Sequence, residues 1–207
     1  MVEIAGEGDL RLFQRSQSGD EAAFVSLYRR WQGAIYRYSL RITGSVSIAE
    51  DVTQEVFLAL MARDSGFDAA RGSFSAYLYG IARNHILRRM TRERLYAPMG
   101  DDSAEDQPTA VEVRDYPSDP LEALTRQEKV DLLQGAVAAL PLRYREVVVL
   151  CELQELNYAQ AAQVIGCPEG TIRSRLHRAR ALLLKKLQQT TTEVSRSARI
   201  EAERCVL

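Results

Sequence analysis

Apolar residues recur at helical spacing along most of the chain. Between residues 49 and 63, Val52, Val56 and Leu60 follow one another four residues apart, while acidic and amide side chains stand at positions 50, 51, 54 and 55. This spacing puts an apolar stripe on one side of a helix. A loop is expected at 64–73, which contains glycines and aspartates, and helical spacing resumes from Phe74 to about residue 95. No segment alternates as a strand does, so the sequence predicts an all-α fold.

The segment 96–122 differs from the rest of the chain. It contains four prolines and many acidic residues, with few large apolar side chains. Proline removes backbone donors from a helix, and like charges oppose collapse, so a flexible linker is expected. We therefore predict two small helical domains, at 9–95 and 123–188, joined by this acidic linker. Residues 189–207 read as a polar C-terminal tail to which we assign no role.

The charges are segregated along the chain, although the net charge is only −1. Residues 76–95 hold five arginines and one glutamate, and residues 165–188 hold six cations and one glutamate. The linker between them has eight acids and one arginine. Two basic surfaces joined by an acidic tether indicate a polyanionic partner such as DNA.

Several classes of protein find no support in the sequence. No apolar run approaches the roughly 18 residues that span a bilayer, and the acidic start MVEIAGEGDL does not resemble a secretion leader. The three cysteines are widely separated and only two histidines occur, so no metal-binding spacing is present. There is no glycine-rich phosphate loop and no nucleophile motif. We expect a cytoplasmic protein without membrane insertion, metal, cofactor or catalytic activity.

The segment YAQAAQVIGCPEGTIRSRL, residues 158–176, predicts a helix-turn-helix. Small Ala162 lets two helices approach, Gly166 allows a tight turn with positive φ, and Ile172 fills the angle between the helices. Pro168 is expected at the first position of the second helix, where its missing N–H costs nothing.

The second helix of this motif has an apolar side and a basic polar side. On a helical wheel, the buried stripe consists of Ile172, Leu176, Ala179 and Leu183. The opposite side and its shoulders supply the residues expected to contact DNA: Arg173, Ser174, Arg175, His177 and Arg178.

Three motifs, in order along the chain, resemble those of one family. The segment from ALPLRYREVVVL to GTIRSRLHRARALLLKKL resembles the −35-binding domain of sigma-70 factors. AEDVTQEVFLAL resembles their polymerase-binding helix, and YLYGIARNHILRR resembles their −10-binding helix. Over residues 9–188 the chain is thus similar to a bacterial extracytoplasmic-function (ECF, group 4) sigma factor, with sigma domain two at 9–95 and sigma domain four at 123–188.

The resemblance implies that the helix at 49–61 binds core RNA polymerase, on the clamp helices of its largest subunit. Acidic and amide side chains would face basic clamp residues, and apolar side chains would anchor the contact. These polymerase-binding residues are Asp51, Gln54, Glu55, Phe57 and Leu60.

The resemblance also implies that the loop 64–74 and the following helix capture the −10 element and help melt DNA. Stacking faces, an amide that reads base edges and cations for phosphates are the groups this needs. The residues expected to do so are Phe74, Tyr77, Arg83, Asn84, Arg88 and Arg89. The run Tyr77-Leu78-Tyr79-Gly80 stands where the family usually has Trp-Leu-Tyr-Arg, which predicts an unusual −10 preference.

One alternative remains open at this point. A helix-turn-helix regulator that is not a sigma factor would use residues 9–95 as a sensor or dimerisation domain. The second basic helix, ARNHILRR, argues against it, because a sensor has no need of one. The sigma-factor reading predicts core RNA polymerase and promoter DNA as partners, together with an anti-sigma factor that holds the protein inactive.

Overall fold

The computed structural model describes residues 7–62, 66–70, 72–96 and 126–204. Within these ranges every regular element is helical and no strand is found, which confirms the predicted all-α class. The predicted linker at 96–122 lies outside the described residues except for Tyr96.

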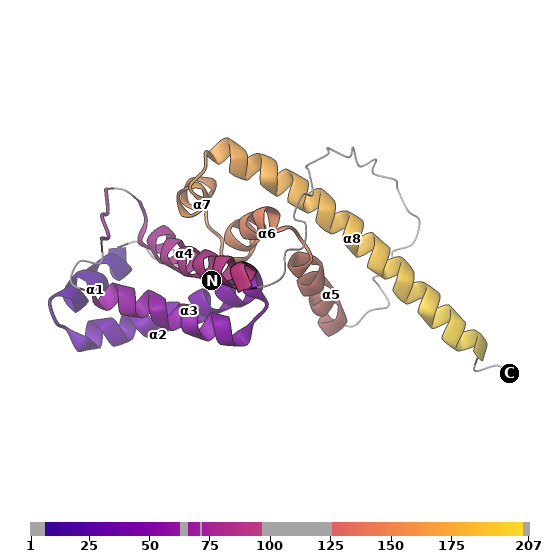
Figure 1. Ribbon diagram of the computed structural model, residues 1–207, viewed down its shortest axis with the longest axis horizontal. Coiled ribbons are helices and arrows are strands. Elements are labelled where there is room, and N and C mark those ends of the chain that lie inside the picture. Colours follow the sequence, from indigo (N-terminus) through magenta and orange to yellow (C-terminus); the bar gives the residue numbers. More distant parts are fainter. Residues whose placement is uncertain (1–6, 63–65, 71, 97–125, 205–207) are drawn as a thin grey trace.

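Four helices form the N-terminal domain, at the left of Figure 1. They are α1 (Glu7–Gln17), α2 (Glu21–Thr43), α3 (Val46–Met61) and α4 (Phe74–Tyr96). Their ends follow from local chemistry. The Asp20 carboxylate accepts a hydrogen bond from the Ala23 N–H at 3.0 Å and caps α2, and Gly44 ends that helix in the left-handed conformation at φ 72°. Ser45 then caps α3, so a two-residue corner joins α2 and α3.

The C-terminal domain begins with α5 (Arg126–Ala138), α6 (Leu142–Val148) and one π-helical turn, η2 (Val149–Leu153). It ends with α7 (Tyr158–Ile165) and the long α8 (Glu169–Arg204). The predicted turn is confirmed: Gly166 has φ 78° and its N–H donates to the Ala162 carbonyl at 2.8 Å. Helix α8 starts one residue later than predicted, with Pro168 just before it. Its backbone continues to Arg204, so the segment we read as a separate tail from 189 prolongs this helix.

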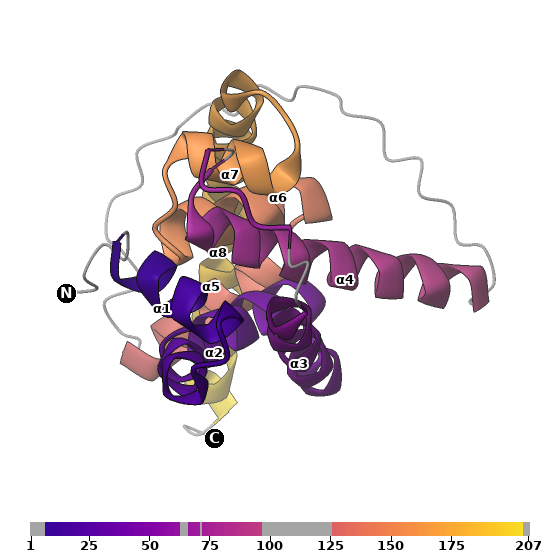
Figure 2. The ribbon, with the colours of Figure 1, turned by 90° about the vertical axis from the view of Figure 1, so that its left-hand side faces the viewer.

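The two domains pack against each other, which the sequence did not predict. Figure 2 shows α7 lying directly above α4, and η2, α5 and α6 contact α2. The buried apolar residues of both domains belong to one connected cluster, from Phe13 in α1 to Ala179 in α8. The two basic helices, α4 and α8, are therefore held in one body, with α7 packed against both.

Candidate nucleic-acid interface

Helix α8 presents the predicted polar face to solvent. Its stripe is confirmed, since Ile172, Leu176 and Ala179 are buried and Leu183 packs partly buried against the core. On the outer side the predicted contact residues Arg173, Ser174, His177 and Arg178 are exposed, and Arg175 is half-buried. An arginine two residues further on, Arg180, forms an ion pair with Glu152 and so faces the protein.

Two local devices hold α8 in this position. Asn157 and Gln160 form a capping box at the start of α7, each side chain bonding the backbone N–H of the other residue at 2.9 and 3.0 Å. At the other end of α7, the N–H groups of Gly166 and Cys167 both donate to the Ala162 carbonyl. Both ends of α7 are thus capped, and buried Ile172 fixes the angle between α7 and α8.

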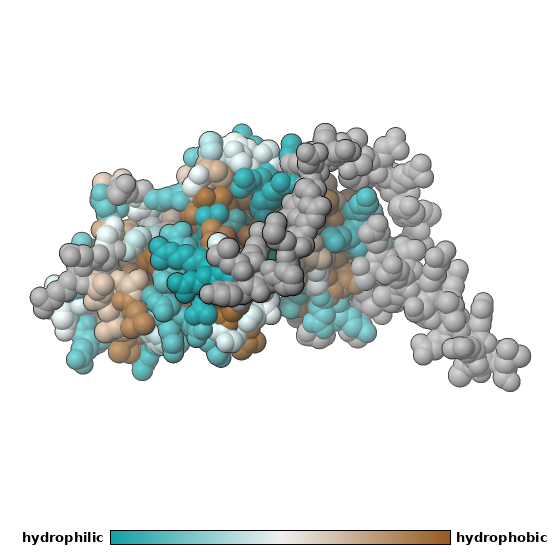
Figure 3. Space-filling model, in the orientation of Figure 1, coloured by the Kyte–Doolittle hydropathy of each residue, from teal (hydrophilic) through white to brown (hydrophobic). Residues whose placement is uncertain are grey.

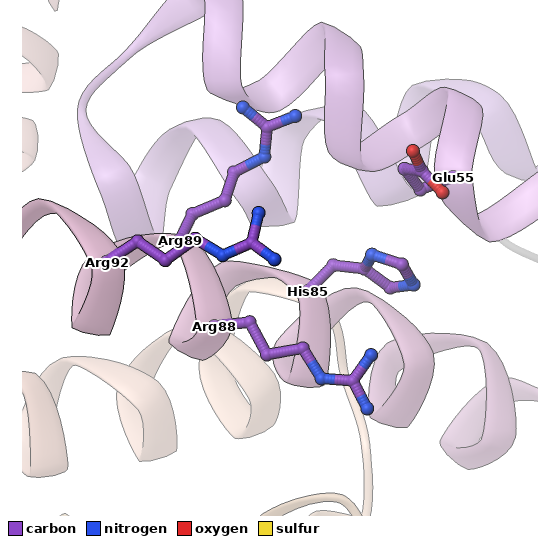
Figure 4. Close-up of a pocket in the computed structure, with 5 residues that line it drawn as sticks. All are labelled: Glu55, His85, Arg88, Arg89 and Arg92. Carbon is purple, nitrogen blue, oxygen red and sulfur yellow. The ribbon is translucent and has the colours of Figure 1, made fainter.

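Helix α4 carries the second basic surface. A cavity of about 410 Å³ lies between α3 and α4, lined by Glu55 from α3 and by His85, Arg88, Arg89 and Arg92 from α4 (Figure 4). A second groove of about 440 Å³ follows the same helix and includes Asn84 and Thr91. With its guanidinium groups and a single carboxylate, this surface suits phosphate oxygens.

The predicted −10 residues divide between two sides of α4. Asn84 and Arg88 are exposed on the grooved side, and Arg89 forms an ion pair with Asp51 at 2.8 Å. Arg83 is on a different side: its Nε donates to Oε1 of Glu146 in α6 at 2.6 Å. The structure therefore does not bring Arg83 together with the other predicted cations.

Some of the aromatic residues at and after the loop are buried in the core, and others are partly exposed. Phe74 is buried, with its ring centroid 5.2 Å from Phe13, so it belongs to the core and offers no free stacking face. Tyr77 is half-buried, and its ring lies 5.2 Å from that of Phe67 in the loop. Tyr79 is buried, and burial raises the pKa of its hydroxyl. Phe67 was not among the predicted contact residues, although it is the one aromatic residue within the segment 64–73.

In helix α3, the two residues expected to be apolar contacts with polymerase, Phe57 and Leu60, are not exposed. Phe57 and Leu60 are only 4% and 1% exposed, because they face the core; the Phe57 ring packs 4.7 Å from that of Tyr28. Besides Val46 at its start, at 54%, the large apolar side chains that this helix exposes are instead Leu58 and Met61, at 59% and 62%.

The predicted polar residues of α3 lie on the same outer side as these two. Gln54 and Glu55 are exposed, and Asp51 is half-buried in its pair with Arg89. Brown apolar patches beside teal surface mark the bundle of α1 to α3 at the left of Figure 3. Positions 54, 58 and 61 recur at helical spacing, so the periodicity contained this signal.

Other kinds of site are not evident in the described part of the chain. It holds no group of three or more histidine, cysteine or acidic residues that could bind a metal. Cys151 and Cys167 are both unpaired thiols. No helix in the same residues is long and apolar enough to cross a membrane.

Fold and surfaces together define the class as an all-α helix-turn-helix protein with two basic helical faces. Comparison with known proteins shows to which family of helix-turn-helix proteins the chain belongs. Residues 27–96 match the model of sigma-70 region 2, and residues 131–183 match that of sigma-70 region 4. The RNA polymerase sigma-H factor of Pseudomonas aeruginosa is 33% identical over 197 residues, which cover 92% of this chain and 99% of that protein.

A second relative and a solved structure also resemble the chain, and both are sigma factors. The ECF RNA polymerase sigma factor SigW of Bacillus subtilis is 29% identical over 174 residues, covering 83% of this chain and 92% of SigW. The sigma factor RpoE from Bartonella quintana, solved in complex with the anti-sigma factor NepR, has 26% identity and a TM-score of 0.54, covering 76% of this chain and 91% of that one. The chain therefore belongs to the sigma-70 family, as an ECF sigma factor that acts in transcription initiation.

Proposed function

We propose that this sigma factor uses three surfaces, of which the first two adjoin: α3 for core polymerase, the grooved side of α4 for the −10 element, and the outer side of α8 for the −35 element. The observation that carries the proposal is that one chain exposes two basic helical faces, around Arg88 and Arg173, and a third face that is acidic and apolar, around Glu55 and Leu58. Basic faces suit DNA phosphates, whereas the third suits a basic protein surface.

For the −35 element, we assign base or near-base contacts to Arg173, Ser174, His177 and Arg178, with Arg175 on phosphate. Arg173→Ala should abolish promoter-specific run-off transcription by the holoenzyme and leave co-elution with core polymerase intact. Each phosphate contact that is lost should also flatten the salt dependence of DNA binding by about one unit. Arg11→Ala, which removes an exposed arginine from α1, is the matched control. Full activity of Arg173→Ala would contradict the assignment.

For the −10 element, we assign Asn84, Arg88 and Arg89 to base edges and phosphates along the grooves of α4. Tyr77, with Phe67 beside it, supplies the stacking face in place of buried Phe74. Tyr77→Ala should reduce strand opening on a linear promoter, measured by permanganate reactivity of unpaired thymines. A promoter melted in advance should restore transcription by this variant; failure there would remove Tyr77 from the melting step.

For core polymerase, we assign Gln54 and Glu55 as polar contacts and replace Phe57 and Leu60 by Leu58 and Met61 as the apolar contacts. Leu58→Glu should abolish co-elution with core polymerase. Val46→Glu is the matched control, since Val46 is 54% exposed on the same helix but about 120° around its axis from Leu58. If the two variants co-elute equally well, the binding surface lies elsewhere.

The remaining elements of the proposal concern the cell. We place the protein in the cytoplasm with the polymerase, without a covalent reaction of its own. We also propose an anti-sigma partner, supported by the similarity to RpoE, which was solved with NepR. A cognate anti-sigma factor should prevent co-elution of the wild-type chain with core polymerase.

A further inference from the structure

One side of helix α1 contacts the elements that surround the loop between α3 and α4. The residues on this side are Asp9, Phe13 and Gln17, which stand four positions apart and so line up along the helix. Asp9 and Phe13 are buried, whereas Arg11 and Gln14, on other sides of α1, are exposed. The residues that match sigma-70 region 2 begin at 27, so α1 lies outside them. Its contacts show what it does.

The first contact fixes the start of α1 on α2. The Asp9 carboxylate is fully buried, and one of its oxygens accepts a hydrogen bond from Nε1 of Trp31 at 3.1 Å. Its other oxygen forms an ion pair with the guanidinium of Arg30. A carboxylate is costly to bury unless it is paired and hydrogen-bonded, as this one is. Asp9 therefore holds α1 at one position along α2.

The second contact joins α1 to the loop. The Phe13 ring lies 5.6 Å from that of Phe67, edge to face, and 5.2 Å from that of Phe74, where α4 begins. Phe67 is the one residue of 66–70 that is not exposed. Its ring also lies 5.3 Å from that of Phe74 and 5.2 Å from that of Tyr77, distances at which aromatic rings attract one another. Phe67 is thus the anchor of residues 66–70, and Phe13 of α1 is one of its supports.

The third contact reaches the end of α3, just before the loop. Gln17 Nε2 donates to the Leu60 carbonyl at 2.5 Å, in the last turn of that helix. The last carbonyls of a helix lack partners within it, so this bond satisfies one of them. Helix α1 therefore touches the end of α3 through Gln17, and Phe67 and the start of α4 through Phe13.

The ring geometry leaves one stacking face for a base. The rings of Phe67 and Tyr77, which we call the stacking platform, are 5.2 Å apart and tilted by 52°. A base inserted between two rings needs them parallel and roughly 7 Å apart, twice the stacking distance of ~3.4 Å. The base therefore stacks on one ring, Tyr77 in our assignment, with Phe67 packed against that ring. A gap of about 0.5–1 Å already loses a quarter to a half of a contact's energy, so the ring must be held firmly.

We propose that α1 positions the stacking platform: Phe13 holds Phe67, Phe67 holds Tyr77, and Asp9 and Gln17 keep α1 in place. Phe13 is a positioning residue for strand opening and does not contact DNA itself, because its side chain is buried. The inference rests on the proposed function, in which Tyr77 stacks on an unpaired −10 base.

The test compares strand opening by holoenzymes that carry Phe13→Ala, Phe67→Ala or both substitutions. Opening is measured on a linear promoter by permanganate reactivity of unpaired thymines, with core polymerase at saturation. Phe13→Ala should reduce opening by roughly three- to tenfold, as expected for lost aromatic contacts. Because Phe13 acts through Phe67, the double variant should lose no more than Phe67→Ala alone. A promoter melted in advance should restore transcription by both single variants.

Two further variants separate positioning from a loss of stability. Phe24→Ala is the matched control, because it removes a half-buried ring that packs on Phe57 of α3, 6.3 Å between centroids. It should leave opening unchanged. Phe13→Leu covers the case in which Phe13→Ala fails to fold, since leucine fills much of the same space but has no ring edge to present to Phe67. It should still reduce opening by roughly twofold or more. The fluorescence of Trp31, the one tryptophan, checks that each variant is folded.

The proposal is overturned if folded Phe13→Ala or Phe13→Leu opens the promoter as the wild type does. It is also overturned if the losses of Phe13→Ala and Phe67→Ala add up in the double variant, or if Phe24→Ala loses as much as Phe13→Ala. Failure of the proposed function would look different: Tyr77→Ala and Phe67→Ala would themselves open the promoter as the wild type does.

Discussion

Truncation of Ile172 should unfold the helix-turn-helix selectively. The side chain is fully buried at the angle between α7 and α8, so Ile172→Ala removes its apolar contacts and leaves a cavity there. Such a substitution costs about 2–5 kcal/mol, and Ile172→Val costs about 0.5–1.5 kcal/mol. A domain of this size has only about 5–15 kcal/mol in total. A loss of ~3 kcal/mol raises the unfolded fraction of the C-terminal domain by roughly 150-fold.

Two optical signals can separate the domains in a urea titration. The chain has one tryptophan, Trp31, which lies in the N-terminal domain with its Nε1 donating to buried Asp9, so its fluorescence reports that domain alone. Circular dichroism reports the helices of both. Ile172→Ala should move the dichroism transition to lower urea and displace the Trp31 transition much less.

The prediction for Ile172→Ala has a control on the same helix and an outcome that would contradict it. His177→Ala, on the exposed side of the same helix, should change stability by no more than about 0.5 kcal/mol. A loss below about 1 kcal/mol for Ile172→Ala would mean that Ile172 does not fix the angle between the two helices. An equal shift of the dichroism and Trp31 transitions would mean that the two domains unfold as one unit.

Three further predictions follow from single sites. Asn157→Ala should cost about 1 kcal/mol by removing the capping box of α7, and Asn157→Asp should retain most of it; urea midpoints would show whether the two differ. Gly80→Ala should stabilise α4 by about 0.5–1 kcal/mol, since a Cβ there meets nothing within 4 Å; a lower melting temperature would contradict this. Burial raises the pKa of Cys151 from 9.0 to about 11. The folded chain therefore binds more protons between these values, so this thiol favours the fold below pH 9 and loses that effect as the pH rises to 11. Alkylation of Cys151 followed by mass spectrometry should accelerate up to about pH 11, and a plateau near pH 9 would refute the shift.

The helical elements could be read from the sequence because their signals are local. The spacing of Ile172, Leu176 and Ala179 gives one side of α8, and Gly166 marks the turn before it, so neither required knowledge of distant residues. The course of α8 beyond residue 188 was missed, since a polar composition does not by itself mark the end of a helix.

The burial and the partners of individual side chains could not be predicted from the sequence where they depend on packing between helices. Phe57 and Leu58 are adjacent and both apolar, and only the packing of α2 decides that Phe57 is covered and Leu58 exposed. Glu146 is a charged residue in a short helix, and nothing in its local sequence indicates burial. Its partner, Arg83, lies 63 positions earlier, so the pair emerges only from the tertiary packing of the domains.

The position of Arg83 has an evolutionary consequence. A residue at the contact between the domains, on the helix assigned to promoter reading, cannot drift freely. Any substitution there alters the ion pair with Glu146 in α6 at the same time as it alters α4 itself. Lineages that retune promoter preference near this position would need a compensating change at Glu146, which predicts covariation of the two sites among related factors.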